Sequence, residues 1–160
     1  MWGTVFPLMV SARFKAIYEV EAMKGVSIFH PAATIVKLGN QKKGNLPEQL
    51  PEYHLIEVTW NAANLEDVAS KVVRKRFDCQ FCRGSIEMHD GIFLEEGSWD
   101  GSDIFEARGL PGKVLISERF KQVVESHQLK NTLLVPAEDY LYNEHQSSMW
   151  RIRENAPANT

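Results

Sequence analysis

The sequence predicts an α+β protein in which two related strand–helix–strand units surround a mixed or antiparallel sheet. Two observations favour this fold class. Residues 8–30 and 114–136 repeat one pattern of apolar and polar side chains at a constant offset of 106 positions. Residues 53–60 alternate apolar and polar side chains, which is typical of a half-buried strand. At 160 residues, the chain is expected to form a single domain over 1–145, followed by a polar tail over 146–160.

In each copy of the repeat, an apolar run leads into an amphipathic segment and then into a second apolar run. Six positions are identical between the copies. Ser11 and Ser117 precede the amphipathic segments, where a serine hydroxyl can accept a hydrogen bond from a free helix N–H. We expect the helices to end near Gly25 and Asn131, because glycine and asparagine tolerate the left-handed conformation that closes a helix. Serine-capped helices are common, so chance similarity is the alternative.

Between the copies, residues 34–38 predict a further strand, and the polar residues 41–51 predict a loop. The alternating residues 53–60 give the clearest strand in the chain. Residues 64–73 are compatible with a short helix, which leads into a basic run at 74–76.

Composition and charge exclude several classes of protein. The net charge of −3 gives no global reason to bind nucleic acid or an anionic membrane. No apolar run is long enough to cross a bilayer. Residues 5–10 contain a proline and follow no basic segment, so they do not predict a signal peptide. Two cysteines separated by two residues suit a reducing compartment, and we therefore expect a cytoplasmic protein.

The cysteine pair, Cys79 and Cys82, has the spacing of a zinc knuckle. A stable structural zinc site needs four ligands; His89 could be a third, and no fourth is evident. The basic residues nearby would lower the pKa of the thiols, which also permits redox chemistry. Three interpretations stay open: a knuckle without metal, a zinc site, or a redox pair.

Residues 86–106 carry seven acidic side chains and no lysine or arginine. Aromatic side chains among charges of one sign suit a surface that binds a basic protein. The candidate partner-binding residues are Glu95, Glu96, Trp99, Asp100, Asp103 and Phe105. The alternative is a solvated loop whose aromatic side chains pack into the core of the protein itself. The spacing of Asp100 and Asp103 matches no calcium loop, and no nucleophile–base arrangement predicts an enzyme.

A wider set of motifs resembles the double-CXXCG motif family of bacteria, known from myxobacterial swarming-inhibition-type immunity proteins. In chain order the motifs that carry the resemblance are residues 6–11, 25–26, 30–31, 50–58, 79–82, 99–105, 117–120 and 135–138. The family is named for two cysteine pairs, and only the downstream pair is present here. The upstream pair is expected before residue 1, in a chain that is either naturally short or a fragment.

The resemblance implies an immunity or antitoxin protein of bacterial competition, which binds and neutralises a cognate toxin and has no catalytic residues. A toxin that attacks nucleic acid is often basic, so an acidic surface would steer and complement it. The alternative from another class is a zinc-knuckle module that binds nucleic acid through Cys79, Cys82 and the basic run 74–76. An enzyme with a carboxylate site at Asp100 and Asp103 is a third hypothesis.

Overall fold

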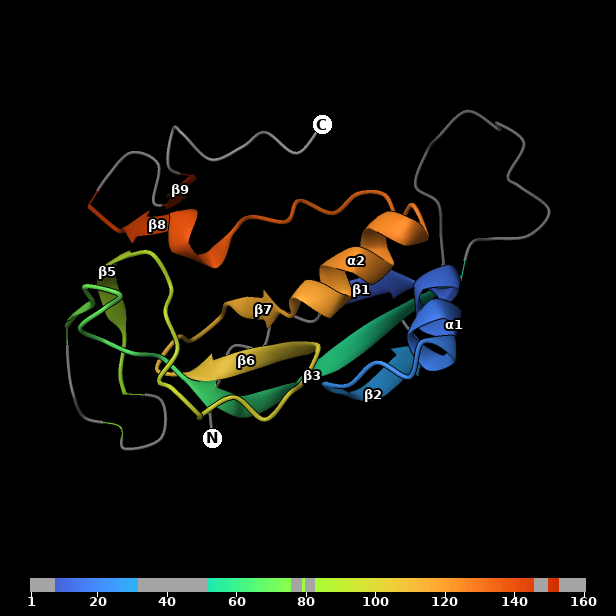
Figure 1. The fold of residues 1–160 in the computed structure, drawn as a ribbon, viewed down its shortest axis with the longest axis horizontal. Coiled ribbons are helices and arrows are strands. Elements are labelled where there is room, and N and C mark those ends of the chain that lie inside the picture. Colours follow the sequence, from blue (N-terminus) through green and yellow to red (C-terminus); the bar gives the residue numbers. More distant parts are fainter. Residues whose placement is uncertain (1–7, 32–51, 76–78, 80–82, 146–149, 153–160) are drawn as a thin grey trace, which may run out of the picture.

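A computed structural model of the chain describes residues 8–31, 52–75, 79, 83–145 and 150–152. Within these ranges, one mixed sheet and one antiparallel sheet combine with helices α1 (Ala12–Val20) and α2 (Glu118–Ser126), as Figure 1 shows. The predicted α+β class is therefore confirmed. No helix in the described part of the chain is long and apolar enough to cross a membrane.

The larger sheet is built around β3 (Tyr53–Asn64). Its first half pairs antiparallel with β1 (Leu8–Ser11) and β2 (Val26–Pro31). Its second half pairs parallel with β6 (Ile104–Arg108), and β6 pairs antiparallel with β7 (Val114–Ile116). The strand predicted from alternating side chains is therefore confirmed, and it continues as far as Asn64.

The smaller sheet has the strand order β4 (Val73–Arg74), β5 (Ile86–Asp90), β8 (Tyr140–Asn143) and β9 (Trp150–Ile152) within the described residues. A single 3-10 turn, η1 (Ala137–Asp139), precedes β8. The strand β9 lies within the segment expected to be a polar tail. Antiparallel pairing with β8 supplies a backbone partner that composition does not reveal.

The helix expected over residues 64–73 is also wrong. Its first residue ends β3, and a single turn follows, in which the Glu66 carbonyl oxygen accepts a hydrogen bond from the Ser70 N–H at 3.1 Å. Lys71 then has a positive φ of 48°, which ends any helical path. The strand expected at 34–38 and the loop expected at 41–51 lie outside the described residues.

The two copies of the repeat begin their helices alike, as predicted. The Ser11 hydroxyl accepts a hydrogen bond from the Phe14 N–H at 3.2 Å, and the Ser117 hydroxyl accepts one from the Phe120 N–H at 3.0 Å. Each serine has the extended backbone conformation of an N-cap residue. The local sequence is therefore sufficient to place both helix starts.

The helices end earlier than predicted. The left-handed residues that close them are Ala22 and Gln128, each with φ of 49°, and not Gly25 and Asn131. In both copies, the N–H of the residue after the left-handed one bonds back to a carbonyl of the last helical turn, which completes a Schellman motif. Gly25 and Asn131 also have positive φ, at 109° and 64°, but they turn the chain three residues later.

The second apolar run of each copy behaves differently. In the first copy it forms β2, whereas residues 132–136 of the second copy form no strand, so the strand predicted there is wrong. A strand in this position would need an edge of β6, and β6 already pairs with β3 on one side and β7 on the other. Pro136 also lacks the N–H that a ladder requires. The segment instead passes outside the sheet, as Figure 1 shows.

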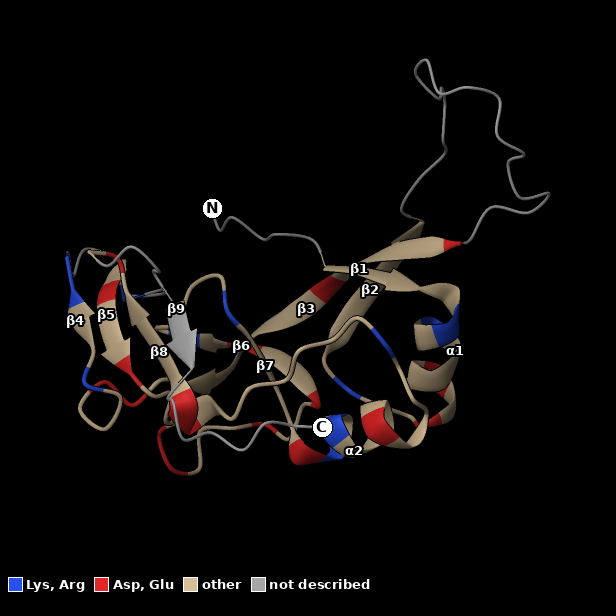
Figure 2. Cartoon of the chain, turned by 90° about the horizontal axis from the view of Figure 1, so that it is seen from above, with Lys and Arg blue, Asp and Glu red and all other residues tan. Residues whose placement is uncertain are grey.

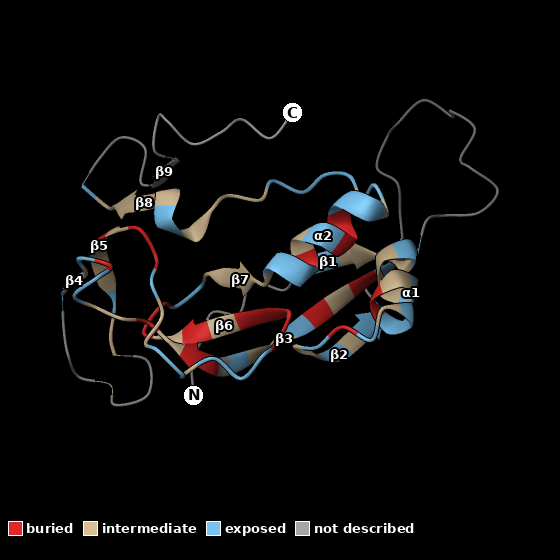
Figure 3. Ribbon diagram, in the orientation of Figure 1, coloured by how far each residue is buried: buried red, intermediate tan, exposed pale blue. Residues whose placement is uncertain are grey.

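Two hydrophobic clusters make up the core. The first joins α1 and α2 to one face of the larger sheet, and its buried members are Tyr18, Met23, Ile56, Ile104, Phe120, Val123 and Val124. The second lies on the opposite face, where the smaller sheet adjoins, and its buried members are Ala62, Ala63, Leu65, Ile92, Phe105, Ala107 and Leu110. Figure 3 shows the buried residues concentrated along β3, β6 and one side of α2.

The helix ends of the two copies contact each other reciprocally. Arg13 donates a hydrogen bond to the carbonyl oxygen of His127 at 2.6 Å, and Arg119, at the position equivalent to Arg13, donates one to the carbonyl oxygen of Glu21. The side chains of Glu21 and His127, which are also equivalent, meet with 2.8 Å between Oε1 and Nε2. Such i-to-j and j-to-i contacts are the pattern of a symmetric interface.

Candidate functional site

The segment that the sequence predicts to bind a partner runs beside the second half of β3. The Glu95 N–H donates to the carbonyl oxygen of Asn64 and the Asp100 N–H donates to that of Ala62, both at 2.9 Å. The Asn64 N–H donates to the Ser98 hydroxyl at 3.0 Å. Although residues 97–103 form no helix or strand, as predicted, these bonds hold the segment against the sheet.

Trp99 is the more exposed of two large aromatic side chains at the surface of this segment, with 46% of its surface accessible against 42% for Phe93. Its indole N–H donates to the carbonyl oxygen of Ser102 at 3.1 Å, and its ring packs on that of Phe105 with 6.1 Å between centroids. The Asp100 carboxylate accepts the Ser102 N–H at 2.9 Å and stabilises the same turn. The indole is therefore presented in a defined orientation, which limits the entropy lost when a partner covers it.

The acidic side chains of residues 86–106 do not form a field of one sign. Figure 2 shows both signs on α1 and on α2, and a basic residue on β4 beside the acidic residues of β5. Four of the seven acids pair with basic side chains from outside the segment: Glu87 with His145, Asp90 with Lys71, Glu95 with Arg83, and Asp103 with Arg119. Glu96 and Asp100 are exposed and form no ion pair among the described residues.

Two of the predicted partner-binding residues lie in the interior. Asp103 is 3% exposed, and its carboxylate accepts hydrogen bonds from the Lys24 N–H at 2.9 Å, the Ser117 hydroxyl at 2.9 Å and the Arg119 guanidinium at 2.7 Å. Phe105 is 3% exposed and belongs to the second hydrophobic cluster. Their side chains therefore stabilise the fold and contribute nothing to the exposed surface.

The other predicted residues of the segment stay at the surface. Glu95 binds the Arg83 guanidinium at 2.6 Å, and this contact holds the pKa of the Glu95 carboxyl below its usual range. Together with Glu96, Trp99 and Asp100 it defines what we call the Trp99 surface. Of the predicted acidic surface, the exposed Trp99 indole and its acidic neighbours are therefore the part that lies at the surface of the protein.

The cysteine pair cannot be assembled into a site from the described residues. Cys79 is partly buried, and Cys82 lies outside the described residues. His89, the suggested third ligand, is 2% exposed, and burial lowers the pKa of its imidazole. Its Nδ1 lies 3.0 Å from the carbonyl oxygen of Gly91, and its Nε2 has no hydrogen-bond partner. The ring stacks on Tyr140 and Tyr142, with centroids 5.7 Å away in both cases.

The two described residues of the basic run 74–76, Arg74 and Lys75, are engaged within the protein. The Arg74 side chain is 2% exposed and forms a two-pronged pair with the Asp67 carboxylate, with distances of 3.0 and 2.7 Å. The Lys75 ammonium lies 2.6 Å from the Glu144 carboxylate, a contact that raises the pKa of Lys75. Arg76 lies outside the described residues. Arg74 and Lys75 are therefore not arranged to contact phosphates.

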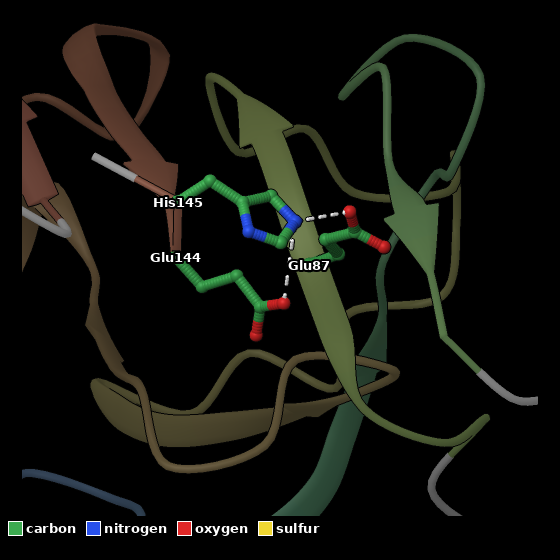
Figure 4. Close-up of side chains that lie close together, drawn as sticks. All are labelled: Glu87, Glu144 and His145. Atoms are coloured by element: carbon green, nitrogen blue, oxygen red, sulfur yellow. Dashed lines mark hydrogen bonds and ion pairs between the residues drawn. The ribbon is translucent and has the colours of Figure 1, made fainter.

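Glu87, Glu144 and His145 form the one group of three potential metal ligands found among the described residues (Figure 4). The His145 Nε2 lies 2.5 Å from Glu87 and 3.5 Å from Glu144. The imidazole is 65% exposed, and Lys75 already supplies a cation to Glu144. We therefore interpret the group as an ion-pair network that joins β5 to the turn after β8.

A groove of about 710 Å³ runs along β7 and was not predicted from the sequence. Two runs of consecutive residues, 112–118 and 133–138, supply much of its lining. Phe105 and Glu106 of β6 also line the groove. Consecutive residues of a strand point to opposite faces of its sheet, so the groove follows the edge of β7 and not one face.

Glu106 is the carboxyl group that distinguishes this groove. Burial raises the pKa of the Glu106 carboxyl, and no described residue forms a hydrogen bond or ion pair with it. The nearby cations are engaged elsewhere: Lys121 pairs with Glu118 at 3.4 Å, and the Lys113 ammonium lies over the rings of Tyr140 and Tyr142. No sequence signal marks Glu106, because its lack of a partner depends on tertiary packing.

Comparison of the chain with protein-family models, with curated proteins and with solved structures finds no match. The resemblance to the double-CXXCG motif family therefore stays a prediction.

Proposed function

We propose that this chain is a cytoplasmic immunity or antitoxin-type protein of bacterial competition, which neutralises a cognate toxin by direct contact through the Trp99 surface. The observation that carries the proposal is the exposed indole of Trp99, which its own segment fixes in place by a hydrogen bond and a ring contact. Tryptophan is among the residues that contribute most often to binding energy when a partner buries them.

The charges around the indole favour a basic partner over an acidic one. Glu96 and Asp100 are exposed beside Trp99 and have no ion-pair partner among the described residues. A basic toxin would place lysine or arginine side chains against them, and arginine can also stack on the indole. Because much of the acidic segment is already neutralised, we expect the indole to contribute more affinity than long-range attraction does.

The zinc-knuckle alternative gains no supporting observation. It requires a basic run that faces a nucleic acid, whereas Arg74 is buried against Asp67 and Lys75 binds Glu144.

The test is a binding measurement with the polypeptide encoded by the adjacent gene, because immunity and toxin genes usually adjoin. We expect Trp99→Ala to weaken the complex by at least about tenfold, which corresponds to roughly 1.4 kcal/mol. Tyr53→Ala is a matched control, since Tyr53 is an aromatic residue with 41% exposure at the opposite end of β3. Equal affinity for the wild type and the Trp99 variant would refute the role of the Trp99 surface, and failure of the wild type to bind or protect would refute the function.

A further inference from the structure

The groove along β7 is lined by two segments of unpaired backbone. Among the described strands, β7 pairs only with β6, so its other edge has no strand beside it. Residues 133–135, which also line the groove, make no hydrogen bond through their backbone within the described part of the chain. Unpaired N–H and C=O groups on both sides of a groove can bond an extended chain laid between them.

The direction of these backbone groups can be deduced from the ladder. The Ser117 N–H donates to the carbonyl oxygen of Asp103 at 2.9 Å, so residue 117 points its backbone groups toward β6. Backbone groups alternate in direction along a strand, and Leu115 therefore also points toward β6. Val114 and Ile116 point their N–H and C=O groups toward the groove.

The side chains of the groove specify which extended chain would fit. Most of its lining is apolar, and Leu133 within it is 74% exposed. Glu106 places a carboxyl group among these apolar residues, and no described residue forms an ion pair with it, although Lys113 and Lys121 also line the groove. A lysine or arginine suits this position, because its aliphatic stem can contact the apolar walls while its charged end reaches the carboxylate.

We propose that the β7 groove binds an extended segment of a partner polypeptide, which adds as a strand to β7 and places a lysine or arginine against Glu106. Phe105 is common to the groove and the Trp99 surface, since it lines the groove and its ring packs on that of Trp99. The peptide site is nevertheless testable without any toxin, so its failure and that of the proposed function are distinguishable.

The experiment uses the full chain, labelled with ¹⁵N, and blocked seven-residue peptides of alternating valine and threonine with one central lysine. We expect the lysine peptide to bind with a Kd below about 1 mM and to shift the amide signals of residues 113–117 and 132–136. A peptide with glutamate at the centre should bind at least about tenfold more weakly. A peptide with alternate backbone amides N-methylated should lose binding as well, since it cannot complete the ladder.

Two variants distinguish the contribution of the Glu106 charge to peptide binding from that of the apolar groove. Glu106→Gln should bind the lysine peptide and a norleucine peptide equally, whereas the wild type should prefer lysine. Leu133→Lys changes an exposed side chain and should weaken all peptides, and thermal unfolding checks that each variant is folded. Absence of binding at about 1 mM, shifts elsewhere on the protein, or equal binding of the lysine and glutamate peptides by the wild type would each overturn the proposal.

Discussion

The two copies of the internal repeat share their helix but not its surroundings. Both begin at a serine N-cap and end in a Schellman motif, and equivalent residues of the two helix ends bind each other. The first copy then returns to the sheet as β2, whereas residues 132–136 of the second copy stay outside it. Local sequence therefore determines the helices, while the available strand edges determine the course of the chain after each helix. The β7 groove exists because residues 132–136 of the second copy form no strand and leave the outer edge of β7 unpaired.

The largest expected difference in stability between the copies arises from alanine substitutions of Gly25 and of its equivalent, Asn131. A Cβ atom at Gly25 would lie 1.8 Å from the carbonyl oxygen of Ile104, and the φ of 109° is unfavourable for any other residue. We expect Gly25→Ala to lower the free energy of unfolding by about 4 kcal/mol or more, because backbone must move. Asn131→Ala should lower the free energy of unfolding by only about 1 kcal/mol, because alanine tolerates the left-handed conformation less well than asparagine does. Urea unfolding measures both, and equal losses would contradict the close approach at Gly25.

A smaller difference in stability is expected when the equivalent residues Phe14 and Phe120 are each replaced by alanine. Their rings lie 6.0 Å apart, but Phe120 is 5% exposed whereas Phe14 is only partly buried. Phe120→Ala should lower the free energy of unfolding by about 3 to 4 kcal/mol, and Phe14→Ala by roughly half of that. Chemical denaturation of the two variants provides the comparison. A larger loss at Phe14 would show that the first copy, and not the second, anchors the helix pair.

The smallest difference concerns the N-cap serines. Each cap is worth about 1 kcal/mol, and Ser117 also donates a hydrogen bond to the buried Asp103 carboxylate. We therefore expect Ser117→Ala to cost about 2 kcal/mol and Ser11→Ala about 1 kcal/mol in unfolding free energy. Threonine at either position keeps the hydroxyl and serves as the control in the same titration. Identical losses at the two serines would mean that the Ser117–Asp103 bond adds no stability.

Much of the local structure was predictable from sequence. The helix starts followed from serine before an amphipathic run, and β3 followed from its alternation. The helix ends were misplaced because Ala22 and Gln128 adopt the left-handed conformation without being glycine or asparagine. Neither residue type signals a helix end, so no sequence pattern could have marked the position.

The candidate sites were less predictable than the fold. Trp99 could be proposed from composition alone, and it is exposed. Asp103 was proposed as a partner-binding residue on the same grounds. Hydrogen bonds from Lys24, Ser117 and Arg119 nevertheless hold its carboxylate in the interior. The groove depends on where residues 132–136 lie relative to β7, and a tertiary relation of this kind leaves no periodic trace in the sequence.

The change of partners along β3 has a consequence for how the protein folds. Its first half pairs with strands from residues 8–31, and its second half pairs with β6, which in turn holds β7. The first copy of the repeat cannot form its ladders before this strand is in place, and the β6–β7 pair of the second copy joins the rest of the sheet through it. Assembly is therefore governed by contacts between distant parts of the chain, which slow the search for the native state and make its loss all-or-none.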